Sequence, residues 1–90
     1  MTPSNMTQTD YNGWTNRATW NVALWIGNDP FLYNTARACV EYRNETESPY
    51  SKFIRCMLNS SNDTTGDDIR WDDETINHDE INDMMLELAE

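Results

Sequence analysis

The chain has 90 residues and a formal net charge of −10. This length predicts one domain, near the lower limit that a single hydrophobic core can support. With six Lys and Arg residues against sixteen Asp and Glu residues, the chain lacks the clustered positive charge that binds nucleic acids or anionic membranes directly.

The first segment, residues 1–12, is polar, and its only charged side chain is Asp10. It lacks the basic start and the apolar stretch of a signal peptide. We therefore expect a flexible N-terminal arm here, followed by one compact domain over residues 13–90. We also expect a protein of the cytoplasm.

Residues 16–26 predict a helix that is buried on several sides, because apolar residues cover most of its circumference. Thr15 and Asn16 are placed to cap its start, and Gly27 and Asn28 favour its end. Aromatic residues at helical spacing are typical of a core, so Trp20 and Trp25 are expected to anchor the later helices.

A second helix is predicted where Asp29 precedes Pro30, since these residues suit an N-cap and the first helical position. It should run to about Asn44. Its expected core stripe consists of Leu32, Ala36, Cys39 and Val40.

The pair Ser48 and Pro49 repeats this start signal and predicts a third helix that ends near Asn59. Its expected core face consists of Tyr50, Phe53, Ile54, Met57 and Leu58.

The part of the chain after the third helix is expected to begin irregularly and to end in a helix. Residues 60–68 lack periodicity and predict a surface loop, and residues 69–76 a short extended piece. Asn77 and Glu80 form a plausible capping pair for the last helix. Its apolar stripe consists of Ile81, Met84, Met85 and Leu88. The predicted fold is a mostly α bundle of about four helices, with a short extended or loop segment before the last one.

The negative charge is concentrated in residues 61–90, which hold eleven acids and one base, Arg70. This segment accounts for the whole net charge, because residues 1–60 carry five acids and five bases. Repulsion among so many carboxylates lowers stability unless a partner or counterions relieve it. We therefore expect a partner protein with a basic surface.

The last predicted helix places carboxylates along one face, because Asp79, Asp83 and Glu87 are four residues apart. The acids that precede this helix are expected to flank it. The candidate partner-binding residues are Asp67, Asp68, Asp72, Asp73, Glu74, Asp79, Glu80, Asp83 and Glu87.

Neither a metal site nor a catalytic site is expected. Residues 61–72 place Gly66 at the sixth position of an EF-hand frame, but the twelfth position holds Asp72 instead of a bidentate Glu. The single histidine, His78, lies among acids, and no hydrolase or phosphate-binding motif occurs. The two cysteines, Cys39 and Cys56, match no metal spacing and are expected to be free buried thiols. We expect no cofactor and no enzymatic activity.

The run from Trp14 to Ile26, WTNRATWNVALWI, resembles the opening motif of a family of short bacteriophage and plasmid proteins. In that family a W-T-N-x-x-T-W-N-V-x-L-W segment precedes small helices and an acidic end. The resemblance implies a phage or mobile-element gene product that works in the cytoplasm of a bacterial host.

Three functions are compatible with these features. The first is a non-enzymatic inhibitor of a host system, whose acidic surface mimics DNA and occupies a defence nuclease, CRISPR or restriction complex. The second is a host-takeover protein that binds a metabolic or transcription protein through an aromatic patch of Tyr11, Trp14 and Trp71. The third is a self-associating accessory phage protein, forming a homodimer through Met84, Met85 and Leu88.

Overall fold

The computed structural model describes residues 13–90, and within that range the chain forms four helices. They are α1 (Arg17–Asn28), α2 (Pro30–Glu41), α3 (Pro49–Asn59) and α4 (His78–Leu88). Residues 13–90 contain no strand, and one isolated bridge pairs Thr64 with Arg70. The expected class, a small and mostly helical bundle, is confirmed. The arm expected over residues 1–12 lies outside the described residues.

Each helix begins at a side chain that accepts a hydrogen bond from a backbone N–H in its first turn. These N-caps are Asn16, Asp29, Ser48 and Asn77. Pro30 and Pro49 occupy the start of α2 and α3, where a missing N–H costs no helical hydrogen bond. The caps predicted for the second, third and fourth helices are therefore confirmed.

Some helix boundaries differ from the prediction. The cap of α1 is Asn16, one of the two residues expected there, and the amide and the hydroxyl of the other, Thr15, donate to Glu80. α1 continues through Gly27 and ends at Asn28. α2 ends at Glu41, three residues early, and the Arg43 guanidinium donates to the carbonyl of Val40 in its last turn.

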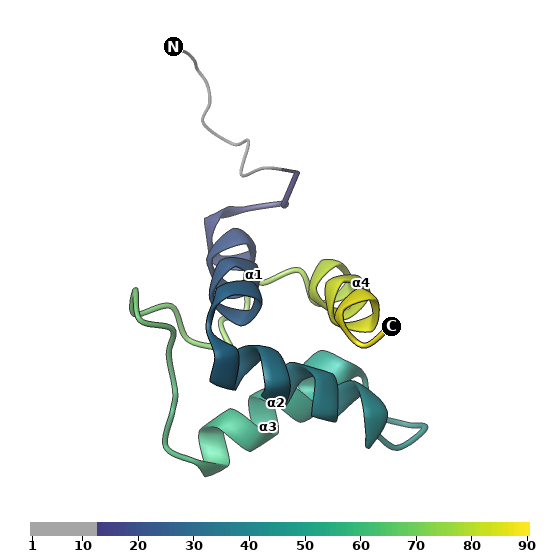
Figure 1. Cartoon of the computed structure of the whole chain (residues 1–90). Helices are drawn as coiled ribbons and strands as arrows, with labels where there is room; N and C mark the ends of the chain where they lie inside the picture. Colours follow the sequence, from purple (N-terminus) through teal and green to yellow (C-terminus); the bar gives the residue numbers. More distant parts are fainter. Residues whose placement is uncertain (1–12) are drawn as a thin grey trace.

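Figure 1 shows α2 and α3 side by side, and α1 packs against α2 while α4 packs against both. α2 contacts the three other helices, and α4 also contacts α1 and α3. The predicted stripe of α2 is buried, as are Tyr50, Phe53 and Met57 of α3 and Ile81 and Met85 of α4. α4 is thus held by the same core as the other helices.

The segment between α3 and α4, residues 60–77, folds back along α1 (Figure 1), and we call it the acidic loop. It is a series of turns and not the extended piece expected over residues 69–76. Its backbone turns are closed by hydrogen bonds such as Asp68 to Thr65 and Ile76 to Asp73. Trp71 and Ile76 from this loop enter the core, so the loop is anchored to the bundle.

Candidate functional site

The acidic loop is joined to α1 through Asp67. Oδ2 of this carboxylate accepts hydrogen bonds from Nδ2 of Asn21 at 2.8 Å and from Nε1 of Trp25 at 3.0 Å. These two bonds, the one from Asn21 first, lower the pKa of Asp67 below its ordinary value. One of the candidate partner-binding acids is therefore used to hold the fold together.

A buried polar network continues from this contact. The Thr65 hydroxyl donates to Oδ1 of Asn21 at 2.8 Å and accepts from the backbone amides of Asp67 and Ile69. Asn21 and Thr65 are 1% and 3% exposed, so these bonds satisfy groups that water cannot reach. The network fixes the turn that carries Asp67 and Asp68.

Gly66 lets the loop approach the Trp25 ring. A Cβ atom on Gly66 would lie 2.4 Å from two carbons of that ring, which is closer than real Cβ contacts. Any other residue would push the loop away from α1 or displace the indole. The glycine is therefore required by the contact between the loop and α1.

A second connection joins α4 to the start of α1. Glu80 accepts hydrogen bonds from the Thr15 amide at 3.0 Å and from the Thr15 hydroxyl at 2.9 Å. Asn77 donates from its amide to the Thr19 hydroxyl and from its side chain to the Thr15 hydroxyl. In the usual capping box Glu80 would bind the amide of Asn77. Here it binds Thr15, just before α1, and together with the bond from Asn77 to Thr19 it fixes the start of α4 to the start of α1.

Two further candidate acids have partners within the loop. Asp72 forms an ion pair with Arg70 at 2.8 Å, and this contact lowers the pKa of Asp72. Asp73 accepts from the hydroxyl and the amide of Thr75, and these bonds lower the pKa of Asp73. Both carboxylates stabilise turns of the acidic loop.

The other five candidate acids are exposed and have no hydrogen bond or ion pair from a side chain within residues 13–90. They are Asp68, Glu74, Asp79, Asp83 and Glu87, and we call them the free carboxylates. Three of them follow one another along α4 at intervals of four residues. The acidic surface expected from the sequence thus contains two kinds of carboxylate, bonded and free.

The expected aromatic patch of Tyr11, Trp14 and Trp71 is corrected by the burial of Trp71, which is 1% exposed. Its ring meets Phe53 edge to face at 5.2 Å in the core, and its Nε1 has no hydrogen-bond partner within residues 13–90. Trp14 is half-buried and borders a cavity of about 350 Å³ with Glu80, Asp83 and Glu87. Tyr11 lies outside the described residues.

The dimer face proposed from Met84, Met85 and Leu88 is also changed by the structure. Met85 is fully buried, and Met84 and Leu88 are half-buried against the same core. Met84 also lines the cavity next to Asp83. This stripe belongs to the fold of one chain.

The cysteines, the histidine and the acids do not form a metal-binding cluster within the described residues. No cluster of three or more His, Cys, Asp or Glu residues within the described part of the chain is arranged to hold a metal ion. Burial raises the pKa of the Cys39 thiol to about 12, with a smaller contribution from Cys56. Cys39 is buried and Cys56 is half-buried, and both are free. His78 is exposed, and its ring is nearly perpendicular to the Tyr50 ring, with the two centroids 5.0 Å apart.

Sequence reasoning missed the residues of α1 that hold the acidic loop, namely Asn21, Thr19 and Trp25. The available signal was polar residues inside an otherwise apolar helix, since Thr19 and Asn21 are buried between apolar neighbours. Their partners lie 42 to 58 residues away in sequence, which no local pattern reveals.

Within residues 13–90, no helix combines the length and apolar character needed to cross a membrane.

Comparison with known proteins identifies a family for this chain. No curated protein and no solved structure is significantly similar to the chain. A family model matches residues 7–90, which cover the motif of α1, the acidic loop and α4. The chain therefore belongs to DUF7249, a family of unknown function.

Proposed function

We propose that this chain is a non-enzymatic phage protein that inhibits a host nucleic-acid-binding protein by covering its basic groove with the free carboxylates. One observation carries the proposal. Asp67 fixes the acidic loop to α1 and Glu80 fixes α4 to Thr15 just before α1, while Asp79, Asp83 and Glu87 are left exposed and unpaired within the described residues. The phage origin rests on the resemblance of the Trp14 to Ile26 motif.

The fixed position of the acids favours recognition over solubility. A segment that only kept the protein soluble would need charge but no fixed geometry. Fixing the segment in advance reduces the entropy that is lost on binding, so the same charges bind a partner more tightly. A duplex presents about one phosphate per 1.7 Å of its axis and binds proteins largely through that charge. An ordered array of carboxylates competes for the same basic groove.

The two alternative functions lose support from the same structure. An adaptor that binds through Tyr11, Trp14 and Trp71 needs an exposed Trp71, and that ring is in the core. A homodimer through Met85 needs a side chain that is already buried, and two chains of charge −10 repel each other.

The proposal is tested by affinity capture from bacterial lysate on the immobilised protein, with elution by increasing salt. We compare D83N/E87Q with the control E41Q/E45Q, which has the same net charge but loses exposed acids at α2 and the segment after it. We expect wild type and the control to capture a DNA-binding protein that elutes with salt. D83N/E87Q should capture at least about tenfold less of this protein. The captured protein should also be displaced by duplex DNA.

Full capture of the partner by D83N/E87Q would contradict mimicry of nucleic acid. So would a complex that neither high salt nor added duplex DNA dissociates. Both variants should keep wild-type stability within a few tenths of a kcal/mol, because the altered acids are exposed. A thermal denaturation curve for each variant therefore separates a loss of binding from a loss of fold.

A further inference from the structure

We propose that the apolar cavity at the corner between α1 and α2 is a second contact site, which takes a large apolar side chain next to a basic residue of a partner protein. This inference rests on the proposed function in one respect, the basic character of the partner. It concerns a different set of residues from the free carboxylates.

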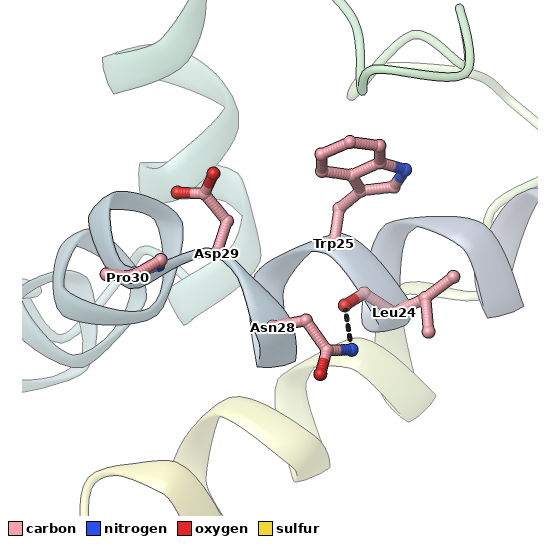
Figure 2. A pocket seen from close by; sticks show the side chains of 5 residues that line it. All are labelled: Leu24, Trp25, Asn28, Asp29 and Pro30. Atoms are coloured by element: carbon pink, nitrogen blue, oxygen red, sulfur yellow. Dashed lines mark hydrogen bonds between the residues drawn. The ribbon is translucent and has the colours of Figure 1, made fainter.

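The cavity has a volume of about 360 Å³, which is within the size range of binding pockets. Figure 2 shows Trp25 standing upright on α1, with Leu24 beside it and Asn28, Asp29 and Pro30 completing the corner. The Asn28 side chain donates to the Leu24 carbonyl at 2.8 Å, as the dashed line marks, so it closes the end of α1. The side chains available to contact a bound group are mainly those of Leu24, Trp25 and Pro30.

Apolar surface continues beyond this cavity. A second cavity, of about 250 Å³, shares Trp25 and Asp29 with the first and adds Phe31. Leu24 is 40% exposed and Phe31 is 59% exposed. Large apolar side chains grouped around one tryptophan are typical of a protein contact site.

The Trp25 ring is held in place for such a contact. Its Nε1 donates to Asp67, so the polar atom is occupied and the ring cannot turn freely. Gly66 packs against the same ring on the loop side. An aromatic side chain that is already fixed loses little entropy when a partner binds to it.

Charge identifies the kind of partner. Asp29 borders both cavities and uses Oδ1 to cap α2, which leaves Oδ2 without a hydrogen bond within residues 13–90. This open oxygen favours a Lys or Arg next to the apolar group. A second copy of this chain, with its charge of −10, does not meet that requirement.

The probe for this site is the dipeptide acetyl-Phe-Arg-amide, titrated into the full-length protein and followed by amide and indole chemical shifts. Acetyl-Ser-Arg-amide carries the same charge without the apolar group. We expect acetyl-Phe-Arg-amide to shift the Trp25 indole and the amides of Asn28 and Asp29, with an affinity about tenfold higher than that of the Ser peptide. Equal effects of the two peptides, or shifts confined to α4, would overturn the proposal.

Leu24→Ser should weaken the binding of acetyl-Phe-Arg-amide by about tenfold, because it removes the apolar wall of the cavity. Leu86→Ser is the matched control, since Leu86 on α4 is 39% exposed, and it should bind as wild type does. A spectrum with wild-type dispersion verifies that each variant is folded. D83N/E87Q should bind the dipeptide normally, so failure of this site and failure of the acidic surface give different results.

Discussion

Two regions of the acidic segment use the same residue types in opposite ways. In the acidic loop, Asp67 accepts hydrogen bonds from two α1 side chains, and its backbone is fixed by Thr65. On the outer face of α4, Asp83 and Glu87 have no such partner within the described residues. The difference teaches that the acids of one highly charged segment can have different roles. Some carboxylates stabilise the fold, and others are left for contact with a partner.

The contrast has a physical basis in what each carboxylate meets. An acid that accepts hydrogen bonds from fixed donors gains stability in its charged form and positions the chain around it. An acid that faces only water contributes an electrostatic field. At physiological salt concentrations, ions screen this field beyond about 8 to 10 Å. Substitutions in the two regions should therefore have effects of different size and kind.

The largest effect is expected for Trp71→Ala, which removes the aromatic side chain that the acidic loop places in the core. The ring is 1% exposed, so we expect a loss of about 3–5 kcal/mol in the free energy of unfolding, measured by urea denaturation. Trp71→Phe should lose roughly half of that or less, because Nε1 has no hydrogen-bond partner within residues 13–90. If Trp71→Ala stayed within about 1 kcal/mol of wild type, the loop would not be part of the core.

A smaller effect is expected for Gly66→Ala, which separates the loop from α1. The new Cβ would overlap the Trp25 ring, so we expect a loss of about 1–3 kcal/mol, measured in the same way. Gly27→Ala is the control, since its Cβ would have no atom within 4 Å and Gly27 lies inside α1. That variant should gain about 0.5–1 kcal/mol, because alanine favours the helix. Equal effects of the two substitutions would contradict the close contact at Gly66.

A third prediction concerns acid, and its effect should be the smallest of the three. The pKa of Asp67 is lowered in the folded protein, so its contribution to stability is complete above the unfolded pKa near 3.8 and is lost as the pH falls through the folded value. Asp67→Asn should therefore flatten the dependence of unfolding free energy on pH below about pH 4. Asn21→Ala, which removes a donor to the same carboxylate, should flatten it too. Wild-type slopes in both variants would rule out this linkage.

Much of the helical framework could be predicted from the sequence, because its signals are local. The caps at Asp29, Ser48 and Asn77 and the core stripe of α2 follow from residues within one or two turns of each other. Of the two caps expected for α1, Asn16 is the cap, while the contact of Thr15 with Glu80 from the far end of the chain has no local signal.

The division of the acids could not be predicted in this way. Nothing near Asp67 in the sequence indicates that Asn21 and Trp25 bind it, because the contact depends on how the loop folds over α1. Trp71 was expected on the surface, since the turns around it have no periodicity that indicates burial. Distant pairing decided which acids are bonded and which are free.

The most direct test of the central claim, that α1 fixes the acidic loop, is a measurement of backbone order by NMR relaxation in the free protein. The account predicts order parameters of about 0.85 for residues 61–76, equal to those of the helices, and lower values in Asn21→Ala. Values below about 0.6 for these residues in the wild-type protein would contradict it, because the acids would then be displayed on a mobile chain.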